Sequence, residues 1–383
     1  MNTLHPADRD RLSTYISNTF DRAQNFIGYP IAQDFDYAPL YPLLKLPLNN
    51  IGDPLLPSTY DLSSREMEKE VLTFFADIFR APEDNWWGYI NNGGSEGNLY
   101  ALYAARELYA NGVVYYSDAT HYSVQKNIKL LNMESIQIRT QAHGEIDYDD
   151  LRKMIDFNRH KPVVMVANIG TTMTEAKDDI SLFRQIMQEL RIDNYYIHCD
   201  AALAGVYSML LELKPGFDFT YGADSISISG HKFIGSPLPC GIVLIKKNHK
   251  DRIGRQVAYI GTIDTTISGS RNGHTPVFLW YAIKCMGSDG FRDRAIACLA
   301  NAEYAVKRFQ EIGIQAWRNN HAITVVFPAL KHAALLEKWQ IATGGGVSHI
   351  ICMPGVHKEK IDEFVADILT LEANTLLEAE LVP

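Results

Sequence analysis

The sequence has little of what marks membrane, secreted or metal-binding proteins. Its 383 residues include only five cysteines, which are scattered and form neither a Cys-x-x-Cys pair nor a Cys/His cluster at zinc-like spacing. No apolar run approaches the roughly 20 residues that span a bilayer, and the charged N-terminus lacks the apolar core of a signal peptide. We therefore expect reduced thiols, no metal, no membrane partner and a cytoplasmic location.

Basic runs are missing as well. The formal net charge is −9, and no stretch of lysine and arginine is long enough to follow a phosphate backbone, so we expect no nucleic-acid partner. With 46% hydrophobic and 21% charged residues, the composition is that of an ordinary globular protein, and we find no internal repeat.

The chain divides into three parts by pattern. Residues 1–60 hold a polar helical start and a Pro-rich stretch, DYAPLYPLLKLPLNNIGDPLLPSTY, in which regular structure is not expected. Residues 61–275 are predicted to form a large cofactor-binding domain. Residues 276–383 are predicted to form a small C-terminal α+β domain.

Short apolar runs alternate with helical patterns through the middle part. The runs are VVYY (113–116), SIQI (135–138), PVVMVA (162–167), YYIHC (195–199), SISIS (225–229) and GIVLI (241–245). Near-continuous apolar strands alternating with helices predict an α/β fold with a mainly parallel sheet covered on both faces. Ligands of such sheets bind beyond the carboxyl ends of the strands, which is where the polar motifs fall.

Lys232 stands in SGHKFIGSPLPCG, directly after the run SISIS. Burial and nearby cations lower the pKa of an amine at such a position, and a neutral amine can form a Schiff base. A lysine that points to solvent from the end of a strand is the alternative. Considered alone, Lys232 is better explained as a solvent-exposed lysine. The motifs that accompany it favour a Schiff-base lysine instead.

Asp200 follows the run YYIHC and opens HCDAALAG. A carboxylate there can pair with a protonated ring nitrogen, the condition under which pyridoxal phosphate acts as an electron sink. Ala202 is small enough to lie flat against a ring, and His198 shares the strand face of Asp200 and can orient its carboxylate. An ordinary helix cap is the alternative for the aspartate.

Gly93, Gly94 and Ser95 precede a helical stretch in NNGGSEGNLYALYAARELY. Glycines let the backbone approach an anion, and amides at the start of a helix point toward it, so we expect a phosphate here. The pattern is neither GxGxxG nor a Walker loop, which disfavours a dinucleotide or a triphosphate.

Two histidines lie near the same predicted edge. His121, in SDATHYSV, can stack on a flat ring and contact a substrate carboxylate, and His231 can reach the phosphate or the substrate. Structural histidines or a metal site are the alternatives, although no fixed ligand spacing supports a metal.

Hydroxyl groups complete the set of candidates. Thr171 and Thr172, in ANIGTTMTEAKDD, are expected to donate hydrogen bonds to ring substituents, with an ordinary turn equally compatible. Ser229 and Ser236 flank Lys232 and are candidate phosphate or substrate ligands.

The motifs GGSEGN, DATHYS, NIGTT, HCDAALAG and SGHKFIG, between residues 91 and 241, resemble those of the group II pyridoxal-phosphate decarboxylases. The resemblance implies an aspartate-aminotransferase-like fold (fold type I), pyridoxal 5'-phosphate as cofactor and decarboxylation of an amino acid. It implies the internal aldimine at Lys232, the pyridinium partner at Asp200, ring stacking by His121 and packing of Ala202 on the opposite ring face. It assigns the phosphate to Gly94, Ser95 and His231.

The branch of the family bears on the substrate. Many members that act on aromatic amino acids have Asn three residues before the lysine and Trp after it, where this chain has Ser229 and Phe233. The resemblance is greatest to bacterial members that convert histidine to histamine, and next to plant-type members that convert serine to ethanolamine. An aminotransferase of the same fold, a nicotinamide oxidoreductase and an inactive binding protein are the remaining alternatives.

The resemblance also implies a homodimer at least, with a homotetramer as an alternative, and active sites at the subunit interface. The polar stretch TIDTTISGSRNGH (262–274) is a candidate loop toward a neighbouring site, through Thr266, Ser268 and Ser270. Candidate contacts to the substrate side chain come from the irregular N-terminal stretch: Tyr37, Tyr41, Asn50 and Asp53.

Overall fold

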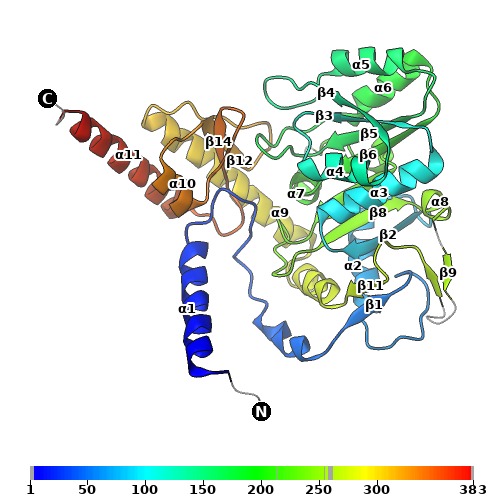
Figure 1. The fold of residues 1–383 in the computed structure, drawn as a ribbon, viewed down its shortest axis with the longest axis horizontal. Coiled ribbons are helices and arrows are strands. Elements are labelled where there is room, and N and C mark those ends of the chain that lie inside the picture. Colours follow the sequence, from blue (N-terminus) through cyan, green and yellow to red (C-terminus); the bar gives the residue numbers. More distant parts are fainter. Residues whose placement is uncertain (1–3, 213, 254, 258–261, 381–383) are drawn as a thin grey trace.

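A seven-stranded sheet forms the centre of the computed structural model, which describes residues 4–212, 214–253, 255–257 and 262–380 (Figure 1). The strand order is β2-β8-β7-β6-β5-β3-β4. The strands are β2 (Trp86–Asn91), β3 (Val113–Ser117), β4 (Glu134–Ile138), β5 (Val163–Asn168), β6 (Tyr195–Asp200), β7 (Ser225–Ser229) and β8 (Gly241–Lys246). Only β8 runs antiparallel to its neighbours in this sheet, so the predicted mainly parallel α/β sheet is confirmed.

The first strand of the sheet, β2, is not among the apolar runs that the sequence singles out. Its sequence WWGYIN is interrupted by Gly88, which weakens a strand pattern. The structure gives the reason for this glycine, because a Cβ there would lie 2.4 Å from the Val243 carbonyl oxygen on β8.

Two helical layers cover the sheet, because alternate strand residues point to opposite faces. Val113 and Tyr115 belong to one apolar core, and Val114 and Tyr116 to the other. The first core packs against α2 (Arg65–Ile78), α5 (Tyr148–Phe157), α6 (Ile180–Leu190) and α7 (Ala204–Leu210). The second packs against α3 (Gly94–Leu108) and α4 (Tyr122–Leu130).

The C-terminal part is a separate antiparallel sheet with helices, as predicted. Its strand order is β12-β14-β13, with β12 (Thr324–Pro328), β13 (Ala342–Gly344) and β14 (Val347–Ile351). The helices are α9 (His274–Glu311), α10 (Ala333–Trp339) and α11 (Lys358–Glu380). Helix α9 is broken at Gly287, whose φ of 59° and ψ of −174° are not helical. The boundary expected at residue 275 stays a prediction, since α9 begins there and continues toward the small domain (Figure 1).

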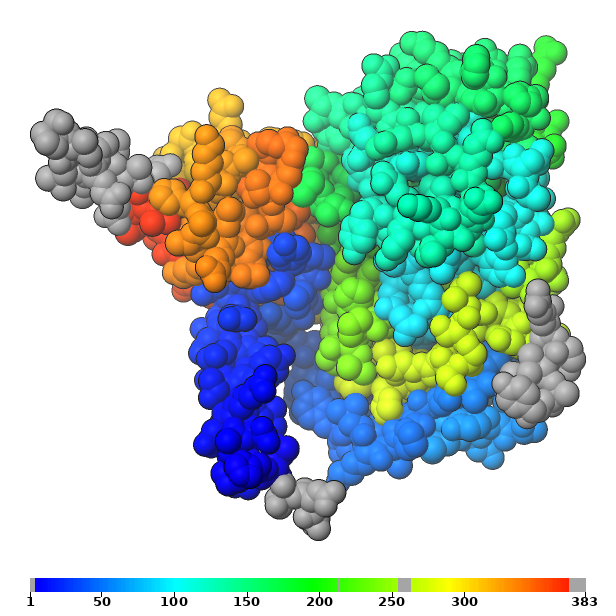
Figure 2. All heavy atoms as spheres, viewed as in Figure 1, coloured from blue at the N-terminus to red at the C-terminus, as the bar shows by residue number. Residues whose placement is uncertain are grey.

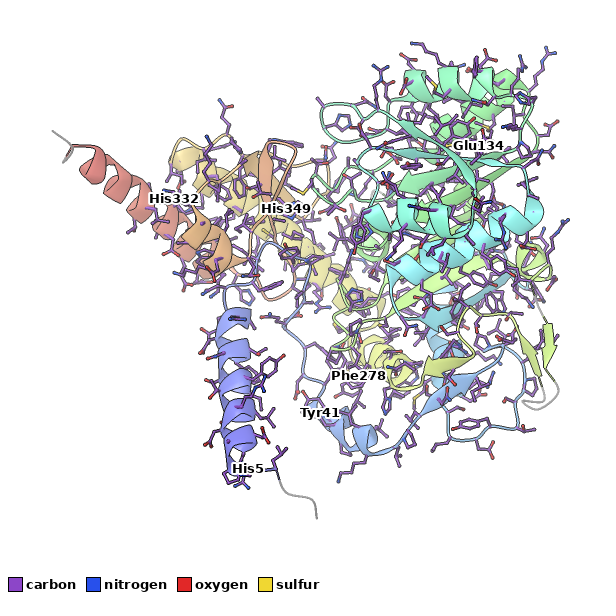
Figure 3. The ribbon with its side chains drawn as sticks, in the orientation of Figure 1. His5, Tyr41, Glu134, Phe278, His332 and His349 are labelled. Carbon is purple, nitrogen blue, oxygen red and sulfur yellow. The ribbon has the colours of Figure 1, made fainter. Side chains whose placement is uncertain are left out.

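The N-terminal part runs along both domains. Helix α1 (Pro6–Ala23) has no buried residue and projects from the body of the molecule (Figures 1 and 2). The chain then joins the small domain, where His349 faces the carbonyl oxygens of Gly28 and Met173, each at 3.1 Å (Figure 3).

The Pro-rich stretch contains more regular structure than the sequence predicts. It forms a 3-10 helix, η1 (Ala38–Lys45), and a short strand, β1 (Asn49–Ile51), which pairs with β11 (Ser270–Asn272). The remaining short elements are η2 (Phe219–Tyr221), α8 (Lys247–Lys250), β9 (Arg255–Val257) and β10 (Thr262–Asp264). Among the described residues, no helix is both long and apolar enough to cross a membrane.

Candidate active site

The predicted site residues lie at one edge of the central sheet. The turn at Gly93 follows β2, His121 follows β3, Thr171 follows β5, Asp200 ends β6 and Lys232 follows β7. These five strands run in the same direction, so their carboxyl ends meet at this edge.

The Gly93 turn places free amides at the start of α3. Gly93 has φ 144° and ψ 171°, a conformation open to glycine, and its N–H donates to Asn91 Oδ1 at 2.9 Å. Within the described chain, the N–H groups of Gly94 and Ser95 have no hydrogen-bond acceptor. Free amides at a helix N-terminus form a ready site for an anion.

Gly94 brings three predicted residues together. A Cβ at this position would lie 2.9 Å from Ser229 Oγ and 3.5 Å from Ala202 Cβ. The glycine therefore keeps open the space between the start of α3 and the ends of β6 and β7.

His231 and Lys232 border the same space. A Cβ on Gly93 would lie 3.8 Å from the ring of His231, whose Nδ1 contacts the Cys240 carbonyl oxygen at 2.8 Å. Lys232 is partly accessible, and the surrounding protein lowers the pKa of its amine, while the charge of Asp200 acts in the opposite direction. A larger fraction of this lysine is therefore neutral at a given pH than of a solvated one.

Asp200 is held by a chain of buried polar groups. Asn98 Nδ2 donates to Asp200 Oδ2 at 2.7 Å, and Asn98 Oδ1 lies 2.9 Å from His198 Nε2. His198 Nδ1 in turn lies 2.8 Å from Ser225 Oγ. Burial lowers the pKa of His198 to about 4, so the ring is neutral, with its hydrogen on Nε2 toward Asn98.

His121 is the N-cap of α4. Its Nδ1 accepts from the Ser123 N–H at 3.3 Å and lies 2.8 Å from Ser123 Oγ, which leaves the hydrogen of the neutral ring on Nε2. Burial lowers the pKa of His121, whereas the charge of Asp200 raises it. His121, after β3, and Asp200, at the end of β6, lie at the same edge of the sheet.

The two threonines differ in their surroundings. Thr171 is buried, and its Oγ1 accepts from the Ala176 N–H at 3.0 Å, so it holds its own turn together. Thr172 is exposed and leaves its hydroxyl available. Ser236 donates to the Leu238 carbonyl oxygen at 2.9 Å, within the loop that follows Lys232.

Among the residues that the structure describes, no hydrogen bond or ring contact joins the N-terminal candidates to the residues at this edge. Tyr37 is buried among aromatic rings, with its ring centroid 5.3 Å from that of Phe278, and its hydroxyl has no partner among the described residues. Tyr41 lies on η1 and is 56% exposed (Figure 3).

Asn50 and Asp53 are buried in a network under β2. Asn50 donates to Glu68 at 2.7 Å and accepts from the Ser64 N–H at 2.9 Å. Asp53 accepts from Trp87 Nε1 at 3.0 Å and Thr265 Oγ1 at 3.1 Å. Their polar atoms serve the interior of this chain, and their role as substrate contacts stays a prediction.

The candidate loop to a neighbouring site is also bonded within the chain. Thr266 Oγ1 donates to the Ser268 carbonyl oxygen at 2.9 Å, and Ser270 Oγ accepts from Asn49 Nδ2 at 3.1 Å. In the described part of the chain, no three His, Cys, Asp or Glu side chains group as metal ligands.

Sequence reasoning missed two residues that support the site. Asn98 has a signal, a polar residue inside the apolar stripe of a helix, one turn after Gly94. Arg294 has none. It reaches from α9 to donate to the carbonyl oxygens of Phe233 (2.7 Å) and Ile234 (3.1 Å), directly after Lys232, and pairs with Asp34.

Comparison with known proteins adds a family. The model of the pyridoxal-dependent decarboxylase conserved domain matches residues 59–327. A histidine decarboxylase of Mesorhizobium japonicum is 47% identical over 365 residues, covering 95% of this chain and 98% of the relative. A histidine decarboxylase of Acinetobacter baumannii is 45% identical over 370 residues, covering 96% of each.

Solved structures agree on the fold. An L-methionine decarboxylase from Streptomyces sp. 590, in its internal aldimine form, has a TM-score of 0.87 at 25% identity and covers 95% of both chains. A glutamate decarboxylase of Lactobacillus brevis, at 18% identity and TM-score 0.79, covers 97% of this chain and 92% of its own. The second likeness concerns the fold alone.

Proposed function

This chain belongs to the pyridoxal-dependent decarboxylase family, and we propose that it converts L-histidine to histamine and carbon dioxide. The proposal is supported by near-full-length relatives named histidine decarboxylase, at 42–47% identity. The structural observation that carries it is the position of Lys232, which follows β7 at the same strand edge as Asp200.

The residues at the edge fit pyridoxal phosphate. The free amides of Gly94 and Ser95 suit its phosphate, since the helix dipole adds positive charge at the same place. The absent side chain of Gly94 leaves the room that a Cβ against Ser229 would fill. Lys232 would hold the cofactor through its amine.

Bound pyridoxal phosphate supplies an electron sink for the pair that remains on the substrate carbon when carbon dioxide leaves. Asp200 would hold a proton on the ring nitrogen, because its carboxylate is kept in place by Asn98 and faces the edge as an acceptor. The buried chain behind Asn98 fixes the direction of that amide.

His121 and Lys232 would act on the substrate. The Nε2–H of His121 is free to bind the substrate carboxylate, because Nδ1 is occupied by Ser123. His121 Nε2 and Lys232 Nζ are groups at this edge that can carry a proton toward the substrate carbon. Carbon dioxide is replaced by a proton, so each turnover takes one proton from the medium.

A substrate panel tests the proposal. The purified protein with pyridoxal phosphate is incubated with L-histidine, L-serine and other amino acids, and released carbon dioxide and amine are measured. We expect histamine from histidine. Ethanolamine as the main product would assign the serine branch, and turnover that needs a keto acid would contradict decarboxylation.

Lysine variants provide the control. Lys232→Ala should abolish turnover together with the absorption band that borohydride shifts. Lys247→Ala, an exposed lysine at the start of α8, should leave both unchanged. A Lys232→Ala protein that keeps the band would contradict the assigned role.

We also propose a homodimer with the site at its interface. Helix α1 buries none of its side chains in this chain, although Tyr15 and Phe20 are 67% and 71% exposed. Exposed apolar side chains repeated along one helix suit a surface that is covered by a second copy. A cytoplasmic location and the division at residues 60 and 275 remain proposals, the former supported by five unpaired cysteines.

A further inference from the structure

A cavity lies where the turn after β5 meets the chain that enters β12. Its volume is about 470 Å³. It is lined by residues of four segments: 143–145, 175–177, 208–211 with 214–215, and 318–321. The proposed reaction uses none of them.

Lys177 brings a weakly bonded ammonium to this cavity. Its side chain is only 14% exposed, yet its Nζ lies 3.3 Å from the His321 carbonyl oxygen and 3.5 Å from that of Asn320. The carboxylate of Glu175 is 3.8 Å away. Both carbonyl bonds are longer than the roughly 2.7–3.2 Å that is usual for an N–H···O bond, so they are weak and an oxyanion at closer range could replace either of them.

Ser208 adds a buried hydroxyl without a partner. The residue is 1% exposed, lines the same cavity, and its Oγ has no hydrogen-bond partner among the described residues. A buried polar group left unpaired is costly, and such groups in folded proteins normally have a partner.

Arg318 lies beside Lys177 with its charge uncompensated. One guanidinium nitrogen donates to the Ala322 carbonyl oxygen at 3.0 Å. Burial lowers the pKa of Lys177, and the positive charge of Arg318 adds to this effect. In the described part of the chain, neither Arg318 nor Lys214 forms a salt bridge. Two adjacent cations at a cavity favour an anionic occupant.

The two carboxylates of the cavity are already engaged. Glu145 accepts from Tyr148 at 2.6 Å and contacts His143 at 2.9 Å. Glu175 accepts from the N–H groups of Thr324 (2.9 Å) and Ile323 (3.2 Å). The oxygens of both carboxylates are therefore bonded to other groups, and neither carboxylate pairs with the guanidinium of Arg318 among the described residues.

We propose that this cavity binds a small oxyanion, a carboxylate or a phosphate, through Lys177, Ser208 and Arg318. The guanidinium offers a planar fork that matches two oxygens, the ammonium adds a charge, and the hydroxyl donates to a third oxygen. The proposal is independent of the substrate of the decarboxylase.

The turn between the cavity and the strand edge links the two places. The Glu175 N–H donates to the Thr171 carbonyl oxygen at 2.8 Å, and the Thr171 N–H donates to that of Ala176 at 2.9 Å. An anion held by Lys177 therefore sits at one end of a short bonded turn whose other end carries Thr171 and Thr172.

Binding is tested on the holoenzyme with saturating pyridoxal phosphate, so that inorganic phosphate cannot enter the cofactor site. Calorimetric titration and thermal unfolding are recorded with sodium phosphate, sodium malonate and, at equal ionic strength, sodium chloride. We expect saturable binding and a raised Tm with phosphate, malonate or both, beyond chloride. The anion that binds more tightly identifies the ligand chemistry.

Two variants locate the site. Arg318→Gln should weaken binding roughly tenfold or more, as expected for loss of a charged hydrogen-bond donor. Ser208→Ala removes an unpartnered hydroxyl, so it should fold at least as well as the wild type and also bind more weakly. Arg106→Gln, whose only ion pair is with its neighbour Glu107, is the matched control.

Three results would overturn the proposal. They are no binding beyond chloride, unchanged binding in both Arg318→Gln and Ser208→Ala, and equal weakening in Arg106→Gln. Because Ser208→Ala is expected to fold, the test stands even if Arg318→Gln does not.

Discussion

The amide of Asn98 joins Asp200 to His198: it donates to the carboxylate across 2.7 Å, and its carbonyl oxygen faces the imidazole Nε2 at 2.9 Å. The three side chains come from α3 and β6, and all are buried. The orientation of the acid that would face the cofactor ring thus depends on a neutral histidine two residues away in the sequence.

Replacing Asn98 by alanine should weaken the reaction without unfolding the protein. We expect kcat/KM to fall by roughly 10- to 100-fold, because the variant loses a hydrogen bond to the charged carboxylate of Asp200. Steady-state kinetics with L-histidine measure the effect. Asn301→Ala is the control. It loses the hydrogen bond that the side-chain amide donates to the Val356 carbonyl oxygen, and it should retain activity. Equal losses in both variants would point to stability alone.

His198 should contribute a loss of stability in acid. Its pKa is about 4 in the folded protein and about 6.5 in an unfolded chain, so the unfolded state binds the proton more readily. Free energy of unfolding is therefore lost as pH falls from about 6.5 to 4, by up to about 3 kcal/mol. Urea unfolding of His198→Gln across this range should lack that loss. An unchanged slope would refute the assignment.

Asp178 should act in the opposite direction over the same range. Burial raises its pKa from 3.8 to about 7, although it accepts from the Asn168 and Ile146 N–H groups. The folded state binds this proton more readily, so stability is lost as pH rises from about 4 to 7. Asp178→Asn should be less stable than the wild type, because its amide N–H₂ meets those N–H donors, but its stability should not fall further as pH rises from about 4 to 7. Urea unfolding at pH 4.5 and 7.5 distinguishes the two effects.

Arg294 should hold the loop that follows Lys232. Arg294→Gln breaks a largely buried pair with Asp34 and leaves two carbonyl oxygens without their donor, which should cost about 3 kcal/mol. Urea unfolding measures the loss, and hydrogen exchange should rise at residues 233–236. Arg106→Gln, on the surface of α3, should change stability by less than about 1 kcal/mol. Unchanged exchange at 233–236 would argue against the clamp.

Charges on α1 should dissociate the proposed dimer. Tyr15→Asp combined with Phe20→Asp places carboxylates on the exposed apolar side chains of that helix. Sedimentation should show the wild type as a dimer and the variant shifted toward monomer, with loss of activity on dilution. Asp8→Asn and Asp21→Asn on the same helix serve as the control and should leave the dimer intact. A double variant that remains dimeric would exclude α1 from the interface.

The fold and the order of the site motifs could be predicted because they depend on local patterns. Apolar runs that alternate with helices place successive strand ends at one edge, and the motifs at Gly93, Asp200 and Lys232 follow those ends. Strand β2 was not predicted because Gly88 interrupts its apolar pattern. The glycine is needed for a contact between strands, the close approach of β2 to β8.

Contacts between residues that are far apart in the sequence could not be predicted, because they depend on how the folded elements pack against each other. Arg294 is far from Lys232 in the sequence, and nothing local in α9 marks its contact with Phe233. A buried polar residue that serves the interior has the same sequence signature as one that serves a ligand. Asn50 and Asp53 illustrate this, since their polar atoms meet Glu68 and Trp87.

The pairing of β2 with β8 has a consequence for how the protein folds. The first strand of the sheet in the sequence lies beside the last, from Trp86 opposite Lys246 to Asn91 opposite Gly241, which closes a loop of about 150 residues. Contacts of such high sequence separation form slowly. A nascent chain that ends before β8 already carries Gly93, His121 and Asp200. Without β8, however, strand β2 has no partner that holds the Gly93 turn beside the other two residues. Acquisition of the cofactor should therefore be among the last events of folding, and it marks a completed sheet.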